Sequence, residues 1–162
     1  MKRENQAAIT AVRDGKVGDV CFARYSLHAP NKPFEVISLH IKEAFDWVRE
    51  VNGKKELKDL YATVNPEKTV WLVTCQFASG TMANLFFDFS GDAYVKQMEV
   101  AGTEGLYVFD SSIERAFQSD FLKQHDVKPE RESGAQADDW WGLAEESLRT
   151  RDKVVPKGGC RV

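Results

Sequence analysis

The fold of this chain is set by the segment Thr69–Ser90, which reads TVWLVTCQFASGTMANLFFDFS. It divides at Ser79-Gly80, a pair typical of a tight turn, into two runs rich in β-branched and aromatic residues. These runs are predicted as strands over Thr69–Ala78 and Thr81–Ser90. Because a turn this short leaves no room for the crossover that parallel neighbours need, we expect the two strands to be antiparallel neighbours.

Further elements surround this pair. Strands are predicted where β-formers lie between short turn signals, over Leu57–Val64, Ala93–Ala101 and Gly105–Asp110. Together with the first pair they are expected to form an antiparallel meander. Before it come a helix over residues 4–14, a strand over Val17–His28 and a helix over Glu35–Val51, whose apolar residues recur every three or four positions. A last helix is predicted from Asp138 or Asp139 to Thr150.

The order of these elements predicts an α+β fold. We expect a mostly antiparallel open sheet of about six strands, with the helices packed on one face. The length of 162 residues fits one domain over 1–162. Within it, 126–138 is polar and is predicted to be an exposed loop, and 156–162 is predicted to be a frayed tail.

Composition excludes several classes of function. The net charge is -3 and charges of both signs are present, so the chain has no overall positive potential that would attract a phosphate backbone. Nucleic acid is therefore not expected as a partner. No run approaches the roughly 20 apolar residues of a membrane span, and no apolar run follows the first charged residues as in a secretory signal. Three widely spaced cysteines form no disulfide or metal framework. We therefore expect a soluble, cytoplasmic protein without a membrane partner.

The second face of the central strands is more apolar than a solvent-exposed face needs to be. Its predicted members are Val70, Leu72, Thr74, Gln76, Met82, Asn84, Phe86 and Asp88. Aromatic residues on an ordinary surface, or cover by the chain's own tail, would explain this pattern. A sheet-to-sheet contact between two copies explains it as well, and we predict a homodimer through this open face.

Motifs for cofactor or nucleophile chemistry are absent from the sequence. There is no GxGxxG, no GxxxxGK[ST], no GxSxG and no HExxH, so we expect neither a dinucleotide nor a metal to bind to this chain alone. Cys21 and Cys75 lie in apolar strands and are predicted to be small core residues. His40 lies beside the apolar stripe of the long helix, with Glu43 three residues later; a half-buried structural histidine is favoured over a site role. The pair Trp140-Trp141 is expected to anchor the last helix.

Five segments carry a resemblance to a known family. They are ITAVRDGKVGDVCFAR (9–24), SLHIKEAFDW (38–47), FASGT (77–81), MEVAGTEGL (98–106) and the segment from Glu146 to Val155. In this order they resemble the C-terminal domain of the Gfo/Idh/MocA oxidoreductases. Enzymes of that family pair a Rossmann domain with an α+β domain that shapes the substrate pocket and often dimerises through its open sheet.

The resemblance implies a site and also a loss. It identifies His40 as the candidate catalytic residue and implies a pocket where the long helix meets the end of the first strand, with Arg24, His28 and Glu43 as substrate-binding candidates. The family's cofactor glycines and its Glu-Lys-Pro segment have no counterpart here. Val36 stands where many members carry an Asp four residues before the histidine, so the proton-transfer pair is predicted to be broken.

Two functions follow from this resemblance. The first is a stand-alone C-terminal domain, not catalytic by itself, that serves as a dimerisation or small-ligand-binding module. The alternative is the substrate-binding half of a split or truncated NAD(P)-dependent oxidoreductase acting on a sugar-like substrate. In that case NAD or NADP would be held by a partner chain with a Rossmann domain. A third and weaker interpretation is a plain partner-binding domain that uses the open sheet face.

Overall fold

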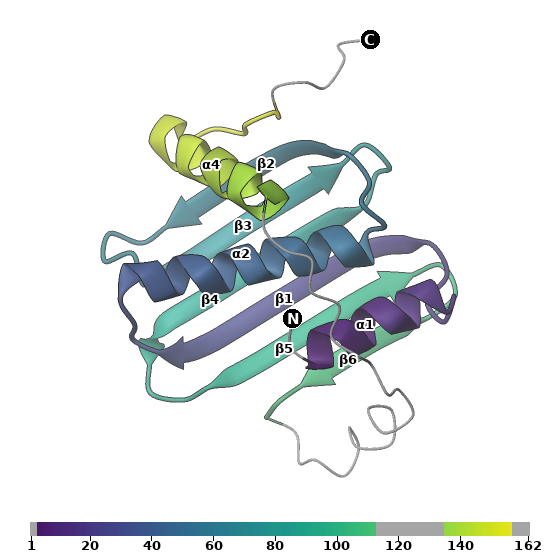
Figure 1. Ribbon diagram of the computed structural model, residues 1–162. Coiled ribbons are helices and arrows are strands. Elements are labelled where there is room, and N and C mark those ends of the chain that lie inside the picture. The colour runs from purple at the N-terminus through teal and green to yellow at the C-terminus, as the bar shows by residue number, and fades with distance from the viewer. Residues whose placement is uncertain (1–2, 113–134, 157–162) are drawn as a thin grey trace.

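A computed structural model describes residues 3–112 and 135–156, which form a sheet covered by helices (Figure 1). The helices are α1 (Arg3–Arg13), α2 (Phe34–Val51) and α4 (Ala135–Thr150). The strands are β1 (Val20–Pro30), β2 (Leu57–Val64), β3 (Val70–Phe77), β4 (Met82–Gly91), β5 (Val95–Gly102) and β6 (Leu106–Asp110). The three helices of the described residues lie over the same face, so the predicted α+β fold with an open sheet face is confirmed for this part of the chain.

The strand order β2-β3-β4-β1-β5-β6 corrects the predicted meander at one point. β1 lies between β4 and β5, parallel to β4 and antiparallel to β5, so these two consecutive strands are not neighbours. The prediction was wrong because residues 92–94 do not form a tight turn between neighbouring strands. Three extended residues reach about 10 Å, which is about two strand spacings and enough to step across one interposed strand.

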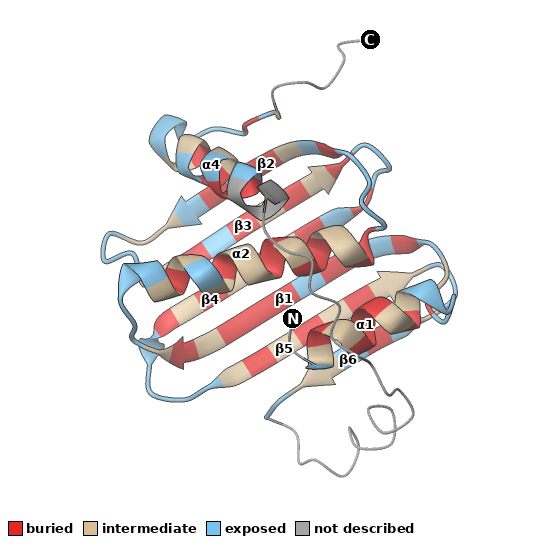
Figure 2. Cartoon of the chain, in the orientation of Figure 1, coloured by how far each residue is buried: buried red, intermediate tan, exposed pale blue. Residues whose placement is uncertain are grey.

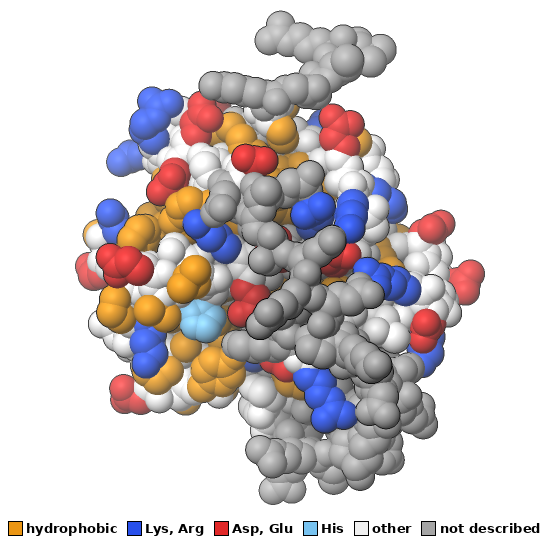
Figure 3. All heavy atoms as spheres, viewed as in Figure 1, with side chains coloured by type: hydrophobic (Ala, Val, Ile, Leu, Met, Phe, Trp, Pro, Cys, Tyr) orange, Lys and Arg blue, Asp and Glu red, His pale blue; other side chains and the backbone are white. Residues whose placement is uncertain are grey.

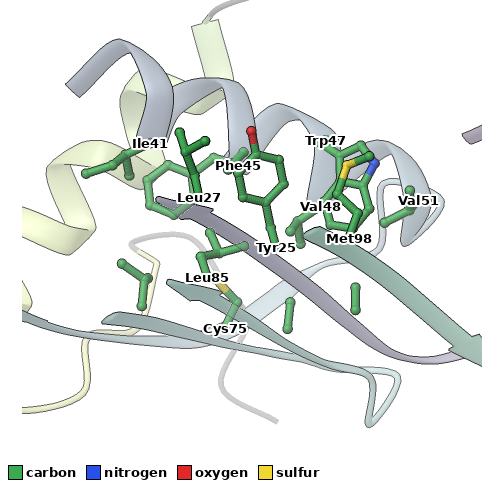
Figure 4. Close-up of a cluster of buried hydrophobic side chains, with 14 of the residues drawn as sticks. Tyr25, Leu27, Ile41, Phe45, Trp47, Val48, Val51, Cys75, Leu85 and Met98 are labelled. Carbon is green, nitrogen blue, oxygen red and sulfur yellow. The ribbon is translucent and has the colours of Figure 1, made fainter. Parts of the chain in front are cut away.

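The hydrophobic core fills the space between the sheet and α2. In β3 and β4 every second residue is buried, as the alternating colours along the strands in Figure 2 show. Tyr25 and Leu27 of β1 point from the sheet toward α2, where they meet Phe45 and Trp47 (Figure 4). The Tyr25 and Trp47 rings lie 5.6 Å apart between centroids. Aromatic packing of this kind fixes α2 across the central strands.

The turn that precedes β1 is locked to the turn that joins β5 to β6. Backbone amides of Thr103 and Glu104 donate to the carbonyls of Asp19 and Val17, each at 3.0 Å. The approach is so close that a Cβ on Gly102 would stand 2.1 Å from the Val17 carbonyl oxygen. Only glycine fits there, because backbone atoms cannot move aside as a side-chain end can.

Helix α4 is anchored by its two tryptophans, as predicted. The Trp140 ring meets Phe45 at 5.8 Å, and the Trp141 ring meets Trp71 at 5.6 Å. The helix begins at Ala135, earlier than the predicted Asp138 or Asp139. Alanine and glutamine are good helix formers and allow this earlier start, and a carboxylate such as Asp139 is stabilised near the positive end of the helix dipole. The rest of the predicted loop and nearly all of the predicted tail lie outside the described residues.

The two described cysteines differ. Cys75 is fully buried, whereas Cys21 is exposed, which corrects the prediction for that residue. The pairing of β1 with β5 shifts register between Val20 and Phe22. This irregularity turns Cys21 out of the core, because an extra residue in one strand is left unpaired. In the described ranges, no helix is long and apolar enough to cross a membrane.

Replacing Gly102 with alanine tests the locked turns. We expect Gly102→Ala to lower the free energy of unfolding by about 3 kcal/mol, because the new methyl group meets backbone atoms. Urea unfolding followed by tryptophan fluorescence measures the change. The matched control is Gly91→Ala, where a Cβ would meet no atom within 4 Å; this variant should stay within about 0.5 kcal/mol of the parent. Equal effects of the two substitutions would contradict the proposed lock.

Candidate functional site

The four predicted site residues lie on opposite sides of the sheet. Side chains alternate along β1, so Arg24 and His28 face away from α2 while their neighbour Tyr25 faces it. His40 and Glu43 lie on α2, on the helix-covered side. The structure therefore does not bring the four residues into one pocket. The sequence could not show this, because the pattern of α2 does not reveal which face of β1 the helix covers.

Arg24 and His28 each have an acidic partner on the open face. Arg24 Nη2 lies 3.0 Å from Glu99 Oε2 on β5, and His28 Nδ1 lies 3.5 Å from Asp88 Oδ2 on β4. The His28 ring also contacts the Phe86 ring, with 5.5 Å between centroids. The strand register places Glu99 directly opposite Arg24 and Asp88 directly opposite His28, while Phe86 lies two residues before Asp88 on the same face of β4. These are cross-strand pairs, which stabilise the sheet where they stand.

His40 has an apolar setting. It is half-buried on α2, and its ring lies 5.9 Å from the ring of Phe89, which belongs to the core face of β4. Near it along α2, Phe34 is 41% exposed and Leu39 is 63% exposed. Figure 3 shows hydrophobic side chains gathered at the end of the molecule where α2 begins. His40 thus lies against the core ring of Phe89 and next to exposed Leu39.

Glu43 belongs to a polar cluster beneath α1. The Asn5 side chain donates to Glu43 Oε1 at 3.0 Å and accepts from Lys96 Nζ. Lys96 is 1% exposed and lies 3.0 Å from Glu4 Oε1. These contacts join α1 to α2 and to β5. The buried Lys96 depends on them, because a buried charge without partners is strongly destabilising. Burial, and then the nearby Glu43 charge, raise the pKa of the Tyr25 phenol well above its ordinary value.

Sequence reasoning missed the cluster around Lys96. The available signal was its position, in phase with Met98 and Val100 on the core face of β5. A lysine at such a position requires buried partners, and here α1 supplies them. Within the described ranges no group of three His, Cys, Asp or Glu side chains is arranged to hold a metal ion. The third histidine, His125, lies outside those ranges.

Asp88 gives a pH-dependent prediction. Hydrogen bonds from the Ser90 hydroxyl and backbone amide, and then the His28 charge, lower the pKa of Asp88 below its ordinary value. A carboxylate with a lowered pKa stabilises the fold above its unfolded pKa of about 3.9, and this contribution is lost as the pH falls. We therefore expect the free energy of unfolding to fall less steeply below about pH 4 in Asp88→Asn than in the parent. Urea unfolding across the pH range measures this.

The control for this experiment is Asp92→Asn, in the exposed turn after β4. It should preserve the acid dependence of the parent. Identical acid limbs for the parent and Asp88→Asn would contradict the assignment of this stabilisation to Asp88.

Comparison of the sequence with known proteins found neither a family model nor a curated protein that matches. Solved structures do match. A probable dehydrogenase from Thermotoga maritima has a TM-score of 0.72 at 18% identity, covering 95% of this chain and 62% of its own. Scyllo-inositol dehydrogenase from Lactobacillus casei, with bound NAD(H) and scyllo-inositol, has a TM-score of 0.68 at 18% identity, covering 93% and 61%.

Myo-inositol 2-dehydrogenase from Lactobacillus plantarum gives a similar result, with a TM-score of 0.67 at 14% identity and coverage of 94% and 61%. The chain thus spans about three fifths of the length of the enzymes it matches. Identities this low establish likeness of fold. This chain has the fold of the C-terminal domain of the Gfo/Idh/MocA dehydrogenases.

Proposed function

We propose that this domain is a dimerisation module whose open sheet face packs against the same face of a second copy. One observation carries the proposal: large apolar side chains stand exposed on strands across this face. They are Tyr61, Leu72, Met82, Leu106 and Val108, each between 38% and 59% exposed. Apolar side chains spread across a whole sheet face are typical of a surface that is covered in the assembled protein.

The charges on the open face suit burial in such an interface. Strand register places Arg24 opposite Glu99 near the middle of the sheet, and the two are already paired within one subunit. Gln97 likewise donates to Asp110 Oδ2 at 2.7 Å. A second copy could cover Arg24 and Glu99 without leaving either charge unpaired, which is the main cost of burying ions, and Asp110 would keep its hydrogen bond from Gln97. A two-fold axis would let one patch serve both subunits.

The oligomeric state in solution tests this proposal. Light scattering at micromolar concentration should give about twice the chain mass of 18.3 kDa. The double variant Leu72→Glu and Val108→Glu should give the single-chain mass, because it places four like charges in the interface of two copies. Both positions are exposed, so the fold should survive, and circular dichroism checks this.

The matched control is Leu39→Glu, which is exposed on α2 on the opposite side of the sheet. It should remain a dimer. A parent protein with the single-chain mass, or a control that dissociates as readily as the double variant, would overturn the proposal.

A second candidate is the substrate-binding half of an NAD(P)-dependent dehydrogenase acting on a sugar-like substrate. Two observations favour it: the fold likeness to the Lactobacillus casei enzyme with bound NAD(H) and scyllo-inositol, and the placement of half-buried His40 next to exposed Leu39 on α2. This part of α2 could receive a dinucleotide-binding domain, with His40 close to the contact. The cofactor would then be held mainly by that other domain.

Titration with scyllo-inositol tests the second candidate. In NMR spectra of the labelled protein we expect the His40 ring signals to shift with increasing scyllo-inositol, and His40→Ala to weaken binding about tenfold. His28→Ala, on the opposite face, should leave the affinity unchanged. NADH fluorescence should show no binding to this chain alone. Signals of His40 that stay fixed up to the solubility limit of the polyol would contradict this candidate and leave the dimer proposal standing.

A further inference from the structure

A cavity of about 520 Å³ lies at the end of α2 that is remote from His40. Its walls come from the last turn of α2, the connection to β2, and α4. The volume falls in the range of small-molecule sites, roughly 300 to 1,000 Å³. Neither the sequence motifs nor the proposed function assigns a role to it.

Charged side chains of both signs line this cavity; two of them, Lys54 and Glu146, pair with Glu50 and Arg149, which lie outside the lining. Arg49 and Lys55 stand on the side of α2 and its following turn, while Asp139 stands on α4 and Glu56 precedes β2. Within the described ranges none of these four side chains forms an ion pair. These four charged groups are therefore not paired with one another across the cavity and can face a ligand within it.

The apolar part of the cavity is rigid. Trp140 is 9% exposed, and its ring is held edge-on against Phe45, with 5.8 Å between centroids and 71° between planes. On its other side it lies 5.8 Å from the Phe77 ring. Leu143 lies next to it along the cavity wall. A tryptophan fixed in this way offers a preformed surface for an apolar group.

We propose that this cavity binds a small zwitterion with an apolar body, the chemical class of an amino acid with a large apolar side chain. The carboxylate would lie toward Arg49 and Lys55, and the ammonium group toward Asp139 and Glu56. The apolar body would lie against Trp140. This proposal is independent of the dimer and of the dehydrogenase role, because it uses neither the open sheet face nor His40.

A simpler explanation competes with this one. Arg49 near the end of α2 and Asp139 near the start of α4 also complement the dipoles of those helices. That role alone would provide no affinity for a zwitterion, so binding experiments separate the two explanations.

Three probes with the same aromatic body test the proposal on the full chain. L-phenylalanine carries both charges, 3-phenylpropanoate only the negative charge and phenethylamine only the positive charge. Calorimetry, together with the indole N–H signal of Trp140 in NMR spectra, reports binding at this cavity. We expect L-phenylalanine to bind at least fivefold more tightly than either analogue, because each lost charge removes one exposed ion pair. Equal affinities, or no shift of the Trp140 signal at millimolar probe, would overturn the proposal.

Variants then assign the two charged sides. Lys55→Gln should lower the affinity for L-phenylalanine and 3-phenylpropanoate about threefold to fivefold and leave the affinity for phenethylamine unchanged. Asp139→Asn should lower the affinity for phenethylamine by a similar factor and leave that for 3-phenylpropanoate unchanged. Both positions are exposed, so folding should not be affected, and thermal unfolding verifies this. The control Lys58→Gln removes an exposed charge from β2 outside the cavity and should change no affinity. A control effect as large as that of Lys55→Gln would also overturn the proposal.

Discussion

The contact between the turn before β1 and the turn between β5 and β6 determines how this sheet is built. Gly102 and Gly105 bring their backbone against Val17 and Lys16, where a Cβ would stand 2.1 Å and 2.5 Å from carbonyl oxygens. The contact joins residues about 85 positions apart in the sequence and sets the start of β1 beside β5. Once β1 is held there, β4 can pair only along its other edge. Two motifs that read separately in the sequence are therefore one structural unit.

The central position of β1 also separates the residues of the open face from those of the helix-covered face. Its alternate side chains send Tyr25 and Leu27 into the core and Arg24 and His28 to the open face. Residues on α2, His40 among them, can only serve the helix-covered side. A dimer through the open face and a ligand or second domain at the helix side would thus not compete for surface. The same separation makes each proposal testable by variants that leave the other side intact.

The helix layer is held by two different means. Aromatic rings fix α2 and α4, with Trp140 packed between Phe45 and Phe77. In contrast, α1 depends on a buried lysine, Lys96, and its hydrogen-bonded partners. The polar cluster stabilises the fold only when every member is satisfied, because a half-satisfied buried polar cluster is strongly destabilising. The rigid contacts under α4 also leave the cavity beside Trp140 with fixed walls, which favours binding without a cost in ordering.

The sequence by itself determined the elements and their faces. Alternation in β3 and β4 separated buried Val73 and Leu85 from exposed Leu72 and Met82, because a strand has a period of two residues wherever it lies. Local turn signals could not determine that β1 enters between β4 and β5. Tertiary structure alone decided this order, the division of the four site candidates, the outward turn of Cys21 and the cavity beside α4. Each depends on residues distant in sequence meeting in space, and periodicity within one segment contains no information about its neighbours.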